Sequence, residues 1–390
     1  MRVTAPPSRA DILVALGTAA LVTVYAILIL WIETENPAPV LVLIAAGAAA
    51  AVAARYFGLT ARVGRVFAEN ERLMNGTAVV AVLAITAAFM SDHFPLLMIA
   101  TVLLYLTACL GLTIQFGYTG VLNFAGAAFF GVGCYTAAVL THHSPLPHLL
   151  ILVIGGLMAA FIGSLLLLPV LRTRGHYAAV VTIAFGLLFK TFLEVNDTLG
   201  GAQGLRVKGM NLFGIAFNDN MEIAGIEISF YVKYVLLALA LLCFAFTVTR
   251  RLERSWIGLN LDAVRLDETA AACFGINIPR WKITAFTVGN FLAGTSGALF
   301  AMMLGFIAPT NFTFGDSLIL VSIIILGGLG NPWGAALATA IVIILPEKLQ
   351  IIQEYRFLLY ALTVILILRF RPAGLVPRAV RAYLPGWRPQ

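Results

Sequence analysis

Apolar runs separated by short polar connections make up most of the chain. A helix needs about 20 residues to cross the hydrocarbon layer of a bilayer, so runs near that length are candidate membrane spans. They occupy 11–32, 38–57, 77–91, 95–115, 124–141, 148–171, 176–195, 230–249, 283–305, 318–346 and 357–370. The pattern predicts an all-α fold, a polytopic transmembrane helical bundle of about ten to twelve membrane helices.

Basic residues gather in every second connection between these runs. They lie at the N-terminus, at 55–72, at 172–174, at 250–282 and in the C-terminal tail, whereas the other connections are acidic or neutral. Because Lys and Arg favour the cytoplasmic side, we expect a multi-pass protein of the bacterial inner membrane with both termini in the cytoplasm. An even number of crossings then fits if GGLGNPWG at 327–334 divides the run 318–346 into two short helices.

The polar segments divide the chain into three predicted parts. Residues 1–76 hold two spans and a cytoplasmic linker, residues 77–377 hold the membrane core, and residues 378–390 form a cytoplasmic tail. Within the core, two segments are too polar to lie in lipid. We expect 196–229 to be an outer loop or a short surface helix, and 250–282 to lie on the inside.

Composition supports lipid as the solvent of this chain. Hydrophobic residues make up 61% of it and charged residues 11%, whereas a soluble domain carries about 25% charged residues. The formal net charge of +7 follows from the basic connections and does not indicate a nucleic-acid partner. The four cysteines lack metal-ligand spacing, and no Ser/His/Asp or paired-carboxylate pattern occurs, so no catalytic residue, metal or cofactor is predicted.

Glycines interrupt two of the predicted spans. The first interruption is QFGYTGVLNFAGAAFFGVG at 115–133, where polar residues alternate with glycines. Glycine allows close helix packing in a membrane, and it also allows an unwound backbone that lines a water-filled path. Both interpretations fit this spacing. The second interruption, LGGLGNPWGAALATA at 326–340, favours the path, because a break in each half of a transporter points to its route.

The sequence therefore predicts broken helices near 115–126 and 327–334. A broken helix exposes backbone N–H groups and a positive helix N-terminus, which meet polar or anionic groups of a substrate. The candidate route residues are Gln115, Gly117, Tyr118, Thr119, Gly120, Asn123, Phe124 and Gly126 in the first break, and Gly327, Gly328, Gly330 and Asn331 in the second.

The inner segment NLDAVRLDETAAACFGINIPRWK at 260–282 has a helical pattern of its own. Ala263, Leu266, Ala270 and Phe274 recur at helical spacing, and Gly275 ends the pattern. The spacing predicts a short amphipathic helix between two spans. Such a helix can insert into a groove on a soluble partner, or it can rest on the lipid headgroups. The pattern alone leaves both open.

A set of motifs resembles the permease subunits of branched-chain amino acid ABC importers (LivM type). They are GLTIQFGYTGVLNFAGAAFFGVGCYTAA (111–138), RGHYAAVVTIAFG (174–186), GGAQGL (200–205), DETAAACFGIN (267–277), AGTSGALFA (293–301), ILGGLGNPWGA (325–335) and FRPAGLVP (370–377). They keep the family's order and together span roughly residues 95–377. Residues 1–76 look like an N-terminal extension.

This resemblance implies an assembly. Such permeases work as two subunits, homologous or identical, with two cytoplasmic ABC ATPase subunits and a periplasmic substrate-binding protein. DETAAACFGIN resembles the part that contacts the ATPase, and the candidate coupling residues are Arg265, Asp267, Glu268, Ala270, Ala271, Phe274 and Gly275. The chain has no G-x-x-x-x-G-K-[ST] loop, so we expect ATP hydrolysis by a partner subunit and not by this chain.

One departure from the family pattern leaves the substrate open. Relatives usually read S-L-G-H-A-A-F-F-G where this chain has Asn123 to Gly131, with Gly126 in place of the histidine. Branched-chain amino acids, amides, urea and small carboxylates all remain candidates. An alternative function is an ion-coupled secondary transporter of a small polar solute, which would need a carboxylate in mid-span. An intramembrane enzyme would need paired catalytic groups at membrane depth. The apolar runs contain almost no groups of either kind.

Overall fold

A computed structural model describes residues 9–32, 37–171, 177–212, 214–223, 225–348 and 374–378, with single positions at 355, 358, 362, 365 and 369. The predicted span at 357–370, the basic connection at 172–174 and the tail beyond Arg378 therefore lie outside the described residues, apart from those single positions.

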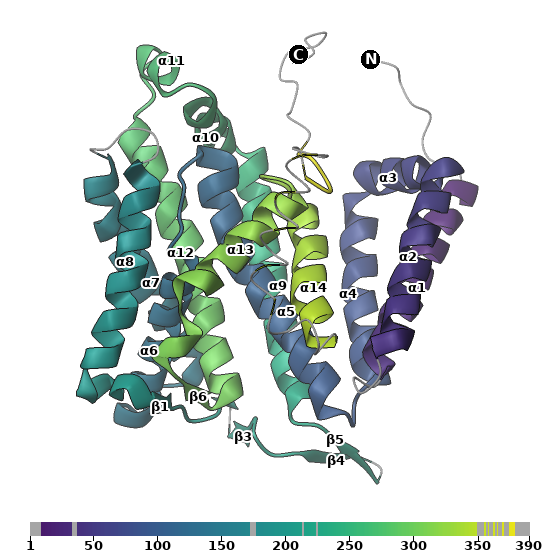
Figure 1. Cartoon of the computed structure of the whole chain (residues 1–390), viewed down its shortest axis with the longest axis horizontal. Helices are drawn as coiled ribbons and strands as arrows, with labels where there is room; N and C mark the ends of the chain where they lie inside the picture. Colours follow the sequence, from purple (N-terminus) through teal and green to yellow (C-terminus); the bar gives the residue numbers. More distant parts are fainter. Residues whose placement is uncertain are drawn as a thin grey trace.

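The described residues form a bundle of helices (Figure 1). Four helices belong to the N-terminal part: α1 (Arg9–Trp31), α2 (Pro37–Tyr56), α3 (Leu59–Glu69) and α4 (Glu71–Ala88). The long helices of the core are α5 (His93–Leu112), α6 (Gly126–His143), α7 (His148–Leu171), α8 (Tyr177–Val195), α9 (Tyr231–Arg254), α12 (Ile278–Leu304), α13 (Phe314–Gly327) and α14 (Pro332–Lys348). Among the described residues, eight helical segments are long and apolar enough to cross a bilayer. The predicted all-α polytopic class is confirmed.

Both predicted helix breaks are present. Helix α5 continues into a π-helix, η1 (Thr113–Tyr118), and the backbone at 120–125 is not helical until α6 begins. The second break, at 328–331, separates α13 from α14, which lie side by side (Figure 1). These two helices are longer than the half-spans that the sequence predicts, since 14 and 17 residues reach roughly 21 and 26 Å at 1.5 Å per residue.

Helix α12 is the centre of the bundle and is packed through small residues. It contacts α5, α6 and α7. At each crossing a glycine lies against the backbone of a neighbouring helix, as in Gly133 against Gly294 and Gly297 against Phe130. Helices in lipid gain little from the hydrophobic effect, so their association depends on such close van der Waals contact. The stretch AGTSGALFA at 293–301 is therefore the packing surface of the core.

The outer segment between α8 and α9 differs from its prediction. We expected a loop or a surface helix at 196–229, and the chain instead forms 3-10 turns and short antiparallel strands. The pairs are β1 (Leu205–Arg206) with β6 (Phe306–Ile307), β2 (Asn211–Leu212) with β3 (Ile215–Ala216), and β4 (Met221–Ile223) with β5 (Ile226–Ile228). The pairing of β1 with β6 joins residues far apart in sequence, which a local pattern does not reveal.

Two polar contacts attach the N-terminal helices to the core. At one end of α4, Glu71 pairs with Arg250 of α9 at 2.6 Å and also with Arg254. The second contact is at the end of α1. The buried Nζ of Lys348 in α14 donates hydrogen bonds to the carbonyl oxygens of Leu30 (2.8 Å) and Ile32 (2.9 Å) there. These carbonyls lie at the end of α1, and the last carbonyls of a helix have no partner within the helix itself. Lys348 therefore serves as the C-terminal cap of α1.

The Lys348→Met variant is expected to lower the free energy of unfolding by about 1.5–3 kcal/mol, because two carbonyl groups lose a charged donor. The measurement is the thermal unfolding midpoint in detergent. The control is Lys190→Met, which removes a partly exposed ion pair with Glu194 and should change the stability by at most about 0.5 kcal/mol. Equal effects of the two variants would contradict the capping role.

Candidate functional site

The two glycine breaks meet inside the protein. Gly117 of η1 lies against the backbone of Gly330, and a Cβ added at Gly117 would come within 2.6 Å of the Cα of Gly330. Gly330 has φ 84°, a conformation that favours glycine. Neither position therefore accepts a side chain without moving its neighbour. The sequence predicts the two breaks separately, and the structure joins them.

Buried amide side chains hold the first break in place. The backbone N–H of Ala125 donates to Oδ1 of Asn123 (2.9 Å), so the Asn123 amide must turn its Nδ2 toward Oε1 of Gln115 (2.7 Å). Nε2 of Gln115 then donates to Oδ1 of Asn290 (2.8 Å) and to the carbonyl oxygen of Phe286 (3.2 Å). One backbone N–H therefore sets the direction of three amides, which tie the break to the central helix α12.

The amide chain ends on a donor without a partner. Among the described residues, Nδ2 of Asn290 has no hydrogen-bond acceptor, and the side chain is buried against Gly163 of α7. A Cβ added at Gly163 would come within 2.9 Å of Cγ of Asn290. The structure shows tight packing around this amide, and the glycine leaves room for it.

Most candidate route residues of the first break are buried, with Gly120 exposed and Phe124 half-buried. Thr119 donates its hydroxyl hydrogen bond to the Gln115 carbonyl at 2.5 Å. Beside them lies a small hollow, to which Asn123 contributes the polar side chain. Its lining residues are Leu112, Phe116, Leu122, Asn123, Phe124, Val321 and Ile324. The hollow lies between the first break and α13, and Gly126 begins α6 beside it.

The second break is covered by the segment 374–378. The backbone N–H groups of Leu375 and Val376 donate to the carbonyl oxygens of Leu326 (2.8 Å) and Gly327 (3.0 Å), which end α13. Gly374 lies against Gly328, where an added Cβ would be 2.6 Å from the Gly328 nitrogen. The end of α13 therefore finds its missing donors in a later part of the chain.

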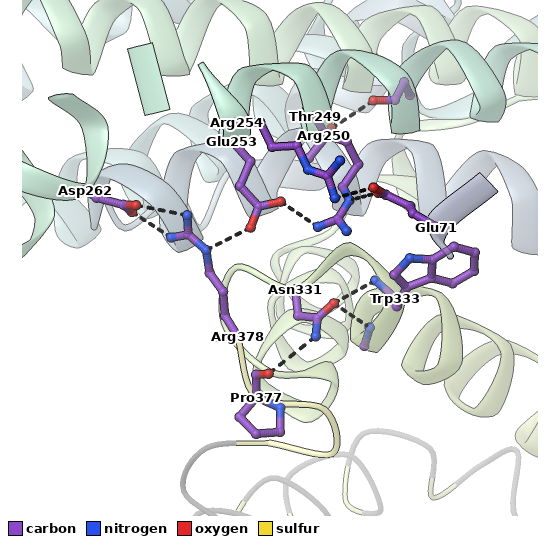
Figure 2. Close-up of polar contacts among 12 residues, drawn as sticks. Glu71, Thr249, Arg250, Glu253, Arg254, Asp262, Asn331, Trp333, Pro377 and Arg378 are labelled. Atoms are coloured by element: carbon purple, nitrogen blue, oxygen red, sulfur yellow. Dashed lines mark hydrogen bonds and ion pairs between the residues drawn. The ribbon is translucent and has the colours of Figure 1, made fainter. Parts of the chain in front are cut away.

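Asn331, a candidate route residue, has a structural role in this geometry. Its Oδ1 accepts hydrogen bonds from the backbone N–H groups of Trp333 (3.0 Å) and Gly334 (3.4 Å), so it caps the start of α14. Its Nδ2 lies 3.5 Å from the carbonyl oxygen of Pro377 (Figure 2).

The helical pattern at 263–274 is divided between two helices, whereas the sequence predicts one. Helix α10 (Trp256–Leu266) ends at Asp267, and α11 (Glu268–Cys273) begins there. Oδ1 of Asp267 accepts from the backbone N–H groups of Thr269 (2.8 Å) and Ala270 (3.0 Å), which makes Asp267 the N-cap of α11. An N-cap has extended backbone angles, so it interrupts the helix that the apolar spacing suggests. Gly275, with φ 78°, ends α11.

Large apolar side chains of this segment face outward. Phe274 is 87% exposed and Leu266 is 78% exposed, while Ala271 is buried and anchors α11 to the core. Ala270 is exposed beside them. Glu268 pairs with Lys282 at 2.6 Å and so joins α11 to the start of α12. In Figure 1, α10 and α11 lie at the opposite end of the molecule from strands β3 to β5.

Arg265 connects this segment to the first break. Its Nη1 donates a 2.6 Å hydrogen bond to the carbonyl oxygen of Gly117, and Gly120 packs against its aliphatic stem. Gly120 has φ 72°, so the backbone there turns in a way that favours glycine. Partial burial lowers the pKa of Arg265 from its usual value, and the nearby Arg378 lowers it further; the guanidinium remains charged. A candidate coupling residue and a candidate route residue are therefore in direct contact.

A chain of charged groups connects α4, α9 and α10 with the segment 374–378 (Figure 2). Arg378 makes two hydrogen bonds to Asp262 of α10, at 2.6 and 3.0 Å, and a longer contact of 3.3 Å to Glu253 of α9. Glu253 pairs with Arg250 at 2.7 Å, and Arg250 pairs with Glu71 of α4. Burial alone would lower the pKa of Arg378, but the hydrogen bonds and charge of Asp262 raise it above its usual value.

Sequence reasoning missed two residues of this site. Arg378 lies at the predicted start of the tail, directly after the motif FRPAGLVP, and Asn290 is a lone amide within the apolar run 283–305. The sequence could have indicated Asn290, because a polar amide in the middle of a membrane span needs a buried hydrogen-bond partner. Nothing in the local pattern indicates that Arg378 returns to α10.

Comparison with known proteins identifies the family. A family model described as the permease component of branched-chain amino acid transport systems matches residues 94–368. The high-affinity branched-chain amino acid transport system permease protein LivM of Escherichia coli K12 is 34% identical over 310 residues, which cover 76% of this chain and 73% of LivM. LivM of Methanocaldococcus jannaschii is 22% identical over 70% of this chain and 90% of its own length.

A second permease protein is more distant. LivH of Salmonella typhimurium is 22% identical over 300 residues, which cover 70% of this chain and 91% of LivH. No solved structure matches the chain. The family model covers more than half of the chain, and LivM exceeds 30% identity over most of both sequences. This multi-pass membrane protein therefore belongs to the family of permease components of branched-chain amino acid transport systems.

Proposed function

We propose that this chain is the permease subunit of an ATP-driven ABC importer for branched-chain amino acids or related small polar solutes such as amides, urea or small carboxylates. It forms the substrate route and docks a separate ATPase. The observation that carries the proposal is the contact between Arg265 of the exposed α10–α11 segment and Gly117 in the first helix break. Through this contact, the surface that a soluble partner would bind is directly connected to the interior of the bundle.

The docking surface consists of the outward-facing residues of α10 and α11. Phe274 and Leu266 are more exposed than most apolar side chains of the core, and an aromatic side chain that fills a pocket on a partner is a frequent energetic centre of an interface. Asp267 and Glu268 add negative charge at the start of α11. We infer that α11 enters a groove on the ATPase, in the manner of a helix-in-groove interface.

The substrate route passes the two glycine breaks. Asn123 brings an amide group to a hollow otherwise lined by apolar side chains, and Gln115 connects this amide to Asn290. Amides donate and accept hydrogen bonds, which suits a zwitterionic or amide substrate. The tight contact between Gly117 and Gly330 closes the region in this structure, so transport requires these breaks to separate.

The proposed assembly contains a second permease subunit, two cytoplasmic ABC ATPase subunits and a periplasmic substrate-binding protein. Two permease proteins of Escherichia coli carry the name of the same transport system, and this chain is 34% identical to one and 22% identical to the other. This supports a pair of homologous but different permeases. We propose that residues 77–377 form the permease core and that residues 1–76 are an extension of it.

The proposed location is the bacterial inner membrane, with both termini in the cytoplasm. Arg250, Arg254 and Arg265 lie at the α10–α11 end of the molecule, and Asp219 and Glu222 lie in the outer segment at the other end. This distribution is the one that the positive-inside rule predicts when α10 and α11 face the cytoplasm.

Reconstitution tests the proposal. We expect ATP-dependent uptake of leucine, isoleucine or valine into proteoliposomes only when this chain, its partner permease, the ATPase and the binding protein are all present. The purified chain alone should hydrolyse no ATP. Uptake by the chain alone that an ionophore abolishes would instead establish an ion-coupled transporter, and intrinsic nucleotide hydrolysis would also contradict the proposal.

The Phe274→Ser variant is expected to weaken ATPase binding by about 2 kcal/mol, a roughly 30-fold rise in the dissociation constant, because it removes an aromatic anchor. The measurement is retention of the ATPase by the detergent-solubilised permease. The control is Phe57→Ser, since Phe57 is 77% exposed at the turn between α2 and α3. A loss of ATPase binding in both variants, or in neither, would reject α11 as the docking helix.

Glu268→Ala combined with Gly275→Ala is a second test of the same surface. Nothing lies within 4 Å of a Cβ added at Gly275, so the expected defect arises from the ATPase contact and from the strained backbone of α11, with the membrane core intact. Normal assembly together with normal ATP-coupled uptake in this double variant would refute the coupling role.

A further inference from the structure

Arg378 lies at the meeting point of the two breaks and the inner segment. Its guanidinium carbon lies 4.4 Å from the ring centroid of Tyr118 at the end of η1. Its aliphatic stem contacts Gly330 in the second break, where an added Cβ would come within 2.7 Å of Cδ. The side chain is only 10% exposed. Arg378 therefore touches both breaks with one side chain.

The same guanidinium is held by α10. Nη1 and Nη2 of Arg378 donate to the two carboxylate oxygens of Asp262, and Nε faces Glu253 of α9 (Figure 2). A two-pronged contact of this kind fixes the orientation of the guanidinium as well as its position. Asp262 lies on the helix that carries Arg265. Helix α10 therefore has two connections to the breaks, one through Arg265 and one through Arg378.

We propose that Arg378 is a positioning residue that transmits movement of α10 to both helix breaks. This inference rests on the proposed function, in which the ATPase moves α10 and α11. A displacement of α10 pulls Asp262, and the paired guanidinium then shifts against Tyr118 and Gly330. The breaks separate together because one side chain contacts both.

Arginine suits this task for chemical reasons. Its planar fork matches the two oxygens of Asp262, and its guanidinium carbon lies over the Tyr118 ring while the edge donates hydrogen bonds. Lysine supplies one compact charge and cannot make both contacts at once. The neighbouring negative charges of Glu253 and Asp262 balance the buried guanidinium, which would otherwise be costly at this depth.

The experiment compares ATP hydrolysis with uptake in the reconstituted complex of permeases, ATPase and binding protein. For Arg378→Gln we expect the complex to assemble and to hydrolyse ATP at a rate within about twofold of the unmodified complex, while the uptake per ATP falls by about tenfold or more. Asp262→Asn should show the same loss. The double variant should be no worse than either single one, because both remove one connection.

Further variants separate positioning from charge and from stability. Arg378→Lys keeps the charge but loses the fork, so we expect it to remain uncoupled. Arg251→Gln, at an exposed arginine on α9, is the matched control and should retain normal uptake per ATP.

An unmodified complex without ATP-driven uptake would disprove the proposed function itself. With a working complex, unchanged uptake per ATP in Arg378→Gln would overturn the inference. Failed assembly, proportional loss of hydrolysis and uptake, or additive effects would also overturn it by assigning Arg378 a purely structural role.

Discussion

The Gly133→Leu variant is expected to prevent the core from reaching its native packing. Gly133 of α6 lies against the backbone of Gly294 in α12, and an added Cβ would come within 2.7 Å of both the carbonyl carbon and the Cα of Gly294. Backbone atoms cannot move aside as a side chain can, so the two helices must separate. Overpacking in a close-packed interior costs about 1–3 kcal/mol and occasionally more, and here it also disrupts the contact of α6 with the central helix.

Expression level and the elution profile in mild detergent would measure this effect. We expect little or no monodisperse protein for Gly133→Leu. The matched control is Gly186→Leu on α8, where nothing lies within 4 Å of an added Cβ. Normal folding of Gly133→Leu would show that α6 and α12 do not pack as described.

The Gly117→Ala variant is expected to have the largest effect on transport. Its Cβ would lie 2.6 Å from the Cα and 2.7 Å from the nitrogen of Gly330, so the contact between the two breaks becomes unfavourable. A penalty of about 1–3 kcal/mol against that arrangement corresponds to a shift of roughly 5- to 150-fold in its population. Because the proposed transport cycle returns to this arrangement, we expect ATP-driven uptake to fall by a similar factor.

Initial uptake rates in proteoliposomes would measure that loss, with the amount of assembled complex measured in parallel. Gly330→Ala should also lower uptake, since its Cβ would come within 2.7 Å of Cδ of Arg378 and 3.3 Å of the Gly117 carbonyl oxygen, and Gly330 has a positive φ. The control is Gly76→Ala on α4, because an added Cβ there meets no neighbouring atom within 4 Å. A Gly117→Ala complex with normal uptake would show that the two breaks need not meet during transport.

Local sequence patterns predict the helices and both breaks because their causes are local. Apolar runs of sufficient length select membrane helices, and the glycines at 117, 120, 328 and 330 occupy the interruptions themselves. The outer segment behaves differently. Leu205 and Arg206 form a strand only because Ile307 and Phe306 pair with them. The residues next to Leu205 and Arg206 do not indicate this pairing, because the partner strand lies about a hundred residues away in the sequence.

The division of the inner segment shows a conflict between two local signals. The spacing of Ala263, Leu266, Ala270 and Phe274 is that of one helix, but Asp267 favours the extended backbone of an N-cap. The capping hydrogen bonds prevail because two N–H groups find an acceptor in the aspartate side chain. The exposure of Phe274 and Leu266 remains consistent with the amphipathic pattern, although two helices present it.

The sequence identifies several residues of the candidate site but does not show which residues contact one another. Gln115, Gly117 and Asn123 are identifiable as unusual residues at membrane depth. Their roles depend on Asn290 and Gly330, which reach them only through tertiary packing. Arg378 depends even more on that packing, because three separate elements create its surroundings. The functional roles of these residues stay predictions until the variants above are measured.

The attachment of residues 374–378 to the end of α13 imposes an order on biogenesis. A ribosome delivers α13 before it delivers Leu375 and Val376, so the carbonyl groups of Leu326 and Gly327 enter the membrane before the amides that will bond to them exist. Until then the turn between α13 and α14 is incomplete, and Gly330 lacks the arginine that lies against it. This end of the bundle is therefore finished by a segment that is translated after both helices, and a nascent chain that stops before Leu375 leaves the two carbonyl groups without these donors.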